Sequence, residues 1–219
     1  MKKLGWGSKM TSSGLIYAAI LLQSGPICTG TIGTPWLSGD KSEKFDERYE
    51  PASLLQNIPS MLDVRVQQAA DEIVSHTGIK SNFTVAPANV ANALAYIGRD
   101  GSRLLLYNPM FMEDVFDNVC KDWGIMDITA HEIGHHLQGH IFRGVDIDYH
   151  QFEIEADEFS GFVLYRMGAT LEEAQRSTAA LAQQQDTATH PGRARRLEAI
   201  KAGWLRARDV AGHEGVADA

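Results

Sequence analysis

The sequence predicts a mainly helical α+β domain with a small antiparallel β-sheet, and three observations support this fold class. Apolar residues recur at helical spacing in several long segments of the chain. One hairpin signal, Arg99-Asp100-Gly101, separates two short apolar stretches. With 219 residues, of which 44% are hydrophobic and 22% charged, the chain has the composition of one ordinary globular domain.

The elements follow in order from residue 56, where we expect the folded domain, 56–209, to begin. A helix is predicted over residues 60–76, and Gly78 is expected to stop it. Extended segments follow at 83–85 and 91–97, and the strand after the hairpin covers residues 102–107. Helices are then expected over residues 110–123, 125–143, 149–167, 170–184 and 191–207, with a frayed tail at 210–219.

The amino-terminal segment differs from the rest of the chain. Three lysines among the first nine residues precede a short apolar run at 15–22, which is the pattern of a signal peptide. The run is shorter than the ~20 apolar residues of a spanning helix. We expect residues 1–30 to direct export to the periplasm, or to anchor the protein peripherally to a membrane, and 31–55 to be a polar linker. An ordinary buried apolar N-terminus is the alternative.

Charge and cysteine content exclude several classes of function. Lys and Arg total 20 against 28 Asp and Glu, so the net charge is −8, which argues against a nucleic-acid binder and a polybasic membrane protein. The two cysteines, Cys28 and Cys120, are too few for a disulfide scaffold or a thiolate metal cluster. Any metal must therefore be held by histidines and carboxylates.

A metal-binding pattern lies in the helix predicted over 125–143. The segment His131-Glu132-Ile133-Gly134-His135 has the form HExxH. Residues four apart leave the same face of a helix, so both imidazoles can reach one zinc ion at ~2.0–2.1 Å. Glu132 is one step round the helix, from where its carboxylate can reach a zinc-activated water and act as general base.

The third ligand is expected on the next helix. The residues after His135 do not continue the metzincin pattern HExxHxxGxxH, because Gly139 and His140 are out of register. Glu153 is the favoured ligand and Glu155 the competing one. Asp157 shares a face with Glu153 and could accept the free ring N–H of a ligating histidine.

The remaining histidines have simpler interpretations. His136 and His140 are predicted to point away from the zinc-binding face, which favours solvent exposure or packing. His150 is expected to be exposed.

Four segments together resemble the gluzincin peptidase family that contains the membrane protease HtpX, the CAAX prenyl endopeptidases and small bacterial periplasmic metalloproteases. In chain order they are Asn92-Ala93-Leu94-Ala95, the HExxH segment followed by His140, Glu153-Ile154-Glu155-Ala156-Asp157, and Thr189-His190-Pro191 with Arg196-Leu197. The match spans about residues 60–205. The transmembrane helices of the integral-membrane members have no counterpart, which implies a soluble or peripherally anchored catalytic domain.

The resemblance implies a zincin-like domain with its sheet packed on the zinc-binding helices and one Zn²⁺ per chain, held by His131, His135 and Glu153. It also implies His190 and Arg196 as donors to the oxyanion of the transition state. The segment Asn92–Ala95 would bind an extended peptide by main-chain pairing. The predicted function is a zinc endopeptidase acting on extended or unfolded proteins.

Two other functions fit the sequence less well. A catalytically silent, zinc-stabilised binding or chaperone-like module would keep the fold, but it would have no use for a general base at Glu132. A metal hydrolase acting on a substrate other than peptide is disfavoured by the candidate edge strand.

Overall fold

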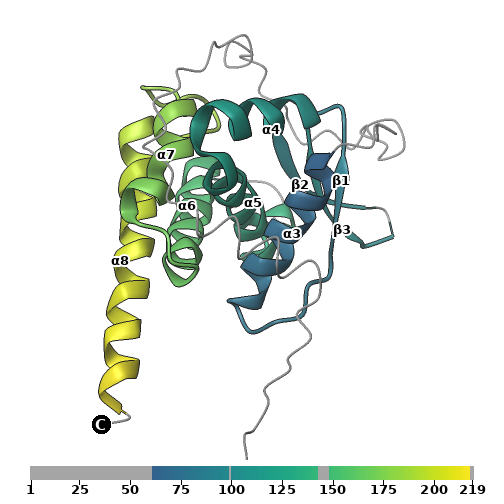
Figure 1. Ribbon diagram of the computed structural model, residues 1–219. Coiled ribbons are helices and arrows are strands. Elements are labelled where there is room, and N and C mark those ends of the chain that lie inside the picture. The colour runs from purple at the N-terminus through teal and green to yellow at the C-terminus, as the bar shows by residue number, and fades with distance from the viewer. Residues whose placement is uncertain (1–60, 99, 143–147, 218–219) are drawn as a thin grey trace, which may run out of the picture.

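The computed structural model describes residues 61–98, 100–142 and 148–217, and these residues form a mainly helical α+β fold (Figure 1). Within them there are six α-helices and one three-stranded sheet. The predicted signal segment 1–30 and linker 31–55 lie outside the described residues. None of the described helices is both long enough and apolar enough to cross a bilayer.

The elements follow the predicted order. They are α3 (Met61–Ser75), β1 (Phe83–Pro87), β2 (Ala93–Ile97), β3 (Arg103–Tyr107), α4 (Pro109–Val115), the π-helix η1 (Phe116–Cys120), α5 (Lys121–Leu137), the 3₁₀ turn η2 (His140–Phe142), α6 (Tyr149–Arg166), α7 (Leu171–Leu181) and α8 (Arg193–Ala217). Helix α7 begins with a capping box, since the side chains of Thr170 and Glu173 each accept a hydrogen bond from the other's backbone N–H.

The sheet is mixed rather than antiparallel, so the prediction of an antiparallel sheet is wrong for one of its two strand pairs. The hairpin is confirmed, because β2 pairs antiparallel with β3 across Gly101, whose φ is +83°. The strand order is β1-β3-β2, and β1 runs parallel to β3. The continuous apolar run Leu104–Tyr107 suits the central strand, and Leu105 to Tyr107 are all buried. This leaves β2 at an edge of the described sheet.

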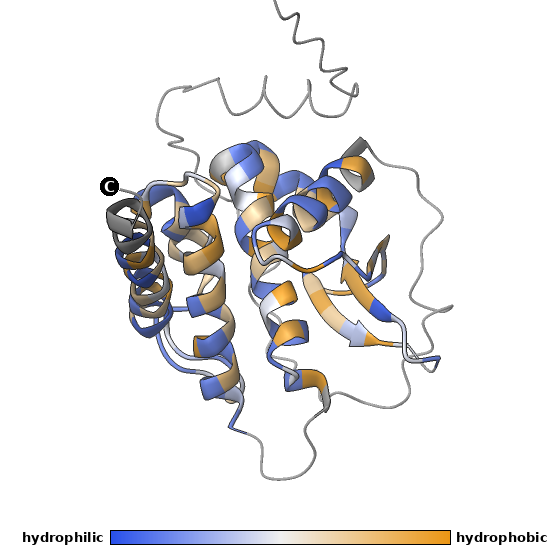
Figure 2. Ribbon diagram, turned by 90° about the horizontal axis from the view of Figure 1, so that it is seen from below, coloured by the Kyte–Doolittle hydropathy of each residue, from blue (hydrophilic) through white to orange (hydrophobic). Residues whose placement is uncertain are grey.

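Helix α5 occupies the middle of the fold. Figure 1 shows it between the sheet with α3 on one side and α6, α7 and α8 on the other. Ile125, Met126, Ala130 and Ile133 bury the apolar face of α5 in the main core. Figure 2 shows the strands coloured mostly as hydrophobic, while the helices carry both hydrophobic and hydrophilic residues. The helix with the HExxH segment is therefore fixed by packing on two sides.

Several helix boundaries differ from those predicted. The helix expected over 110–123 is divided into α4, which ends at Val115, and the π-helix η1, and α5 already begins at Lys121. Helix α5 ends at Leu137 rather than near residue 143, because Gly139 takes a positive φ of +72° and the chain turns into η2. Helix α8 continues through Ala217, so most of the segment expected to be a frayed tail is helical.

Two glycines allow α6 and α8 to pack with their backbones in close contact. A Cβ atom at Gly161 would lie 1.9 Å from the carbonyl oxygen of Ile200, and one at Gly203 would lie 1.9 Å from that of Glu158. Such contacts are sterically forbidden, so only glycine fits. The close approach matters for function because α6 and α8 both supply candidate site residues.

We expect Gly161→Ala to destabilise the protein by at least about 1–3 kcal/mol, because α6 and α8 must separate. Gly212→Ala on α8 is the control, since nothing lies within 4 Å of its added Cβ. The control should be neutral or stabilising by up to about 1 kcal/mol. Urea unfolding of both variants measures the difference, and equal stabilities would contradict the packing described above.

Candidate metal centre

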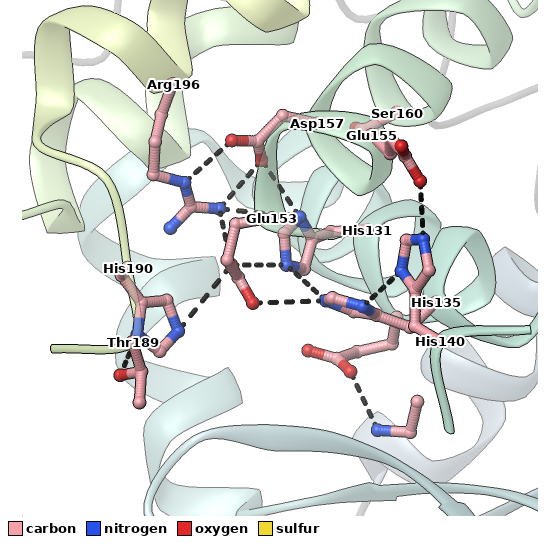
Figure 3. A network of polar contacts seen from close by, with 12 residues as sticks. His131, His135, His140, Glu153, Glu155, Asp157, Ser160, Thr189, His190 and Arg196 are labelled. Atoms are coloured by element: carbon pink, nitrogen blue, oxygen red, sulfur yellow. Dashed lines mark hydrogen bonds and ion pairs between the residues drawn. The ribbon is translucent and has the colours of Figure 1, made fainter. Parts of the chain in front are cut away.

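Three candidate ligands meet between α5 and α6. The Nε2 atoms of His131 and His135 are 3.1 Å apart. Glu153 places Oε2 3.2 Å from His131 Nε2 and Oε1 3.3 Å from His135 Nε2 (Figure 3). Ligand atoms at ~2.0–2.1 Å from one tetrahedral ion would be separated by about 3.3 Å. The three side chains thus form a group that could hold a metal ion.

The local sequence explains why the two helices meet here. A Cβ added to Gly134 would lie 3.1 Å from the Cα of Ala156, so α5 and α6 touch through small residues between the ligands. Ala130 and Ala156 are completely buried on either side of this contact. Longer residues at these positions would hold the histidines and the carboxylate apart.

The donor set fits a cation. Glu153 Oε2 is buried and makes no hydrogen bond to any of the described residues. The Nδ1 atom of His131 lies 2.9 Å from Asp157 Oδ1, and a carboxylate only accepts, so the ring proton sits on Nδ1. When a metal displaces the proton from Nε2, His131 directs the lone pair of that atom toward Glu153. Lone pairs of nitrogen and oxygen converging on one point are the ligands that zinc prefers.

The electrostatics also favour positive charge at this point. Burial disfavours the charged form of His131, but Glu153 and Asp157 outweigh burial and raise its pKa to about 10. Burial alone would raise the pKa of Glu153, yet His131 and His135 hold that pKa well below its usual value. The group therefore stabilises a cation beside an ionised carboxylate.

Arg196 lies behind the ligands and is engaged by Asp157. Its Nε and Nη2 atoms donate to Oδ2 and Oδ1 of Asp157, both at 2.7 Å. Burial would raise the pKa of Asp157, but Arg196 and His131 lower it. Arg196 Nη2 is also 3.9 Å from Glu153 Oε2. The structure thus brings Arg196 to the site through Asp157, and its role as an oxyanion donor stays a prediction.

His190 faces the same group from the segment between α7 and α8. Its Nε2 atom is 3.6 Å from Glu153 Oε2 (Figure 3). Its Nδ1 atom lies 2.8 Å from the hydroxyl of Thr189. The side chain of His190 is 51% exposed, and partial desolvation is the leading influence that lowers its pKa and favours the neutral ring. His150 was expected to be exposed, but its Nε2 atom instead donates to the carbonyl of Thr187 at 2.8 Å and ties this segment to α6.

Glu132 connects the candidate centre to the edge strand β2. Its Oε2 atom accepts a hydrogen bond from the backbone N–H of Ala95 at 2.7 Å. Asn108 N donates to Asn92 O, and Gly98 N donates to Ser102 O. The even-numbered residues of β2 therefore form the hydrogen-bonded pairs with β3. The intervening odd-numbered residues of β2 therefore turn their N–H and C=O groups away from β3. The backbone of Ala93 and Ala95 faces the same side as Glu132.

The four residues of the predicted substrate-binding segment lie at this edge. Asn92 precedes the strand, and its side-chain oxygen accepts from the N–H of Ala93. Ala93, Leu94 and Ala95 are the first three residues of β2. Leu94 packs on the smaller apolar cluster with Leu106, on the face opposite the main core.

Two polar residues of the site were missed or misplaced by sequence reasoning. His140 is buried, and its Nδ1 atom lies 2.9 Å from that of His135. The expectation that His140 points away from the site is wrong, because it assumed that α5 continues past Gly139. The glycine itself was the sequence signal that the helix could end there. Asp127 is buried one turn before His131 and accepts from Ser160 Oγ at 2.7 Å. His136 does pack inside the protein, with Nε2 2.8 Å from the carbonyl of Leu104.

Comparisons with protein-family models, curated proteins and solved structures find no match to this chain. The resemblance to gluzincin peptidases therefore depends on the motifs, and membership of that family stays a prediction. What the structure adds is the meeting of His131, His135 and Glu153 in space.

The buried pair formed by Asp157 and Arg196 can be tested against an exposed pair on the same two helices. Arg196→Met should destabilise the protein by about 3–5 kcal/mol, because it leaves Asp157 buried without its partner. Arg206→Met, which removes the exposed contact of Arg206 with Glu158 at 3.4 Å, should cost about 1 kcal/mol or less. Denaturant unfolding gives both values, and similar costs would contradict the burial of the first pair.

The pH dependence of stability should reveal Asp127. Burial raises its pKa to about 6, and the hydrogen bond from Ser160 only partly opposes this. The folded protein then binds a proton that the unfolded chain has released, so the stability associated with Asp127 falls as pH rises from about 4 to 6.

Asp127→Asn removes this titration and keeps an acceptor for Ser160. Relative to wild type, we expect the variant to gain about 2–3 kcal/mol between pH 4 and pH 7. Urea unfolding at both pH values is the measurement, and a stability difference that does not change with pH would refute the shifted pKa.

Proposed function

We propose that this protein is a zinc-dependent endopeptidase of the gluzincin type. The observation that carries the proposal is the convergence of His131, His135 and Glu153 next to Glu132, which in turn contacts the edge strand β2. Metal ligands, a carboxylate suited to proton transfer and a surface for an extended backbone thus occur together. By the same reasoning, we propose one zinc ion per chain.

His131, His135 and Glu153 would hold the metal. A bound zinc ion would lower the pKa of a water molecule toward ~7 and polarise the carbonyl of the substrate. Asp157 would keep the proton of His131 on Nδ1, so that Nε2 stays available as a ligand. Three protein ligands leave room for water and substrate, as is usual for catalytic rather than structural zinc sites.

Glu132 would act as the general base. It belongs to the same turn of α5 as the ligands, but its carboxylate reaches toward β2 rather than toward Glu153. It would take the proton of the attacking water and pass it to the amine that leaves. The N–H of Ala95 holds the carboxylate between the metal ligands and the strand where a peptide would lie.

The edge of β2 would bind the substrate by main-chain pairing. The outward N–H groups of Ala93 and Ala95 are bonded to Asn92 and Glu132, and Ala95 is only 2% exposed, so a peptide that pairs with this edge would displace these contacts. Because a folded protein offers few unpaired extended segments, this mode of binding favours unfolded or flexible substrates.

His190 is the better placed of the two proposed oxyanion donors. If the hydroxyl of Thr189 donates to Nδ1, the neutral ring carries its proton on Nε2, which faces the centre. Arg196 contributes its charge from behind Asp157. Export through residues 1–30, with action in the periplasm or at a membrane surface, is the matching proposal for location.

Exchange of the general base separates a peptidase from a silent binding module. Zinc-loaded Glu132→Gln should retain the metal but lose at least roughly 10²-fold in peptide cleavage, because proton transfer is removed. Mass spectrometry of a mixed peptide library measures cleavage, and metal analysis measures zinc. Glu158→Gln, a change at a partly exposed position of α6, is the matched control and should cleave as the wild type does.

Two outcomes would contradict the proposal. Loss of zinc in Glu132→Gln would make Glu132 a ligand or a structural residue. Zinc binding without cleavage by the wild type would favour the binding or chaperone-like module.

A further inference from the structure

We infer that Glu155 and His140 form a hydrogen-bond relay that sets the tautomer and orientation of His135. The inference rests on the proposed metal site and deepens it, because it assigns a function to two residues outside the ligand set. Figure 3 shows contacts that run from Glu155 to His140 and from His140 to His135, on the opposite side of His135 from Arg196.

The direction of the relay follows from its far end. His140 Nε2 lies 2.8 Å from Glu155 Oε2. An ionised carboxylate can only accept a hydrogen bond, so the proton of a neutral His140 must sit on Nε2. This leaves a lone pair on His140 Nδ1, which is 2.9 Å from His135 Nδ1.

Two facing nitrogens at this distance need one proton between them, and His140 has none to offer at Nδ1. His135 therefore donates from its own Nδ1 and keeps the lone pair on Nε2. That Nε2 atom faces His131 Nε2 at 3.1 Å and Glu153 Oε1 at 3.3 Å. The relay thus selects the one neutral tautomer of His135 that can bind a metal at this point.

The surrounding structure holds the relay in place. The side chain of His140 is only 3% exposed, and its ring stacks on Phe152 at 4.3 Å with an angle of 2° between the planes. Gln151 Nε2 donates to Glu155 Oε1 at 2.9 Å. Gln138 Nε2 donates to the backbone carbonyl of Glu155 at 2.7 Å, which joins the end of α5 to α6.

Both candidate histidine ligands are then supported by a carboxylate of α6. His131 is bonded directly to Asp157, whereas His135 is supported by Glu155 through the ring of His140. The kink at Gly139 places His140 where it can bridge this longer gap. His140 and Glu155 are positioning residues, because neither lies in contact with the proposed metal position.

Zinc affinity of the full chain tests the relay. His140→Phe keeps an aromatic ring to stack on Phe152 but removes the acceptor, and Glu155→Leu removes the carboxylate. Both should weaken zinc binding roughly 10- to 100-fold, as loss of such partners does at other zinc sites. His140→Asn, whose Oδ1 can replace Nδ1 as acceptor, should recover most of the affinity, and Glu158→Gln should leave it unchanged.

A spectroscopic measurement distinguishes positioning from a merely structural effect. Nitrogen-15 NMR of the imidazole rings, recorded with and without zinc, should show the proton of His140 on Nε2 in the wild type. In Glu155→Leu this preference should be lost. A wild-type His140 protonated on Nδ1, or on both nitrogens, would overturn the relay, as would unchanged zinc affinity in both His140→Phe and Glu155→Leu.

The failure of the proposed function has a different signature. A wild-type chain that binds no zinc would refute the metal centre. The tautomer of His140 in the zinc-free protein would still decide whether the relay exists.

Discussion

The contact between α5 and α6 determines whether the candidate centre can exist. Gly134 lets the backbone of α6 approach at Ala156, and this brings a carboxylate from one helix between two histidines of the other. The sheet and α3 pack against one side of α5, while α8 packs against α6 through Gly161. Most of the fold can thus be understood as a support for this one helix pair.

Burying the charged side chains of this site costs free energy, and the ion pairs and hydrogen bonds around them offset that cost. Two carboxylates, Glu153 and Asp157, are almost entirely buried, and such groups are stable only when they are paired. Arg196 satisfies Asp157, and Asp157 in turn orients His131. Glu153 Oε2 makes no hydrogen bond within the described structure. A cation bound beside this oxygen would neutralise its charge.

The sequence was informative where local geometry alone decides the result. Spacing within a helix placed His131 and His135 on one face, and the hairpin signal located β2 and β3. Glu153 was favoured over Glu155 because it shares a face with Asp157, and the structure indeed turns Glu155 toward His140 instead.

The features that were not foreseen depend on long-range packing or on a single backbone angle. The parallel pairing places β1 beside β3 rather than beside β2, which follows it in the chain, and no local pattern encodes that choice. The position of His140 depends on the positive φ of Gly139, and assuming an uninterrupted helix reversed its predicted direction. The burial of Asp127 requires Ser160 of another helix, which sequence spacing cannot reveal.

The most direct test of the account is a crystal structure of the zinc-loaded full chain with data collected at the zinc absorption edge. The account predicts one strong anomalous peak per chain, within ~2.0–2.2 Å of His131 Nε2, His135 Nε2 and a carboxylate oxygen of Glu153. A peak held instead by His140 and Glu155, or peaks only at surface residues, would contradict the central claim.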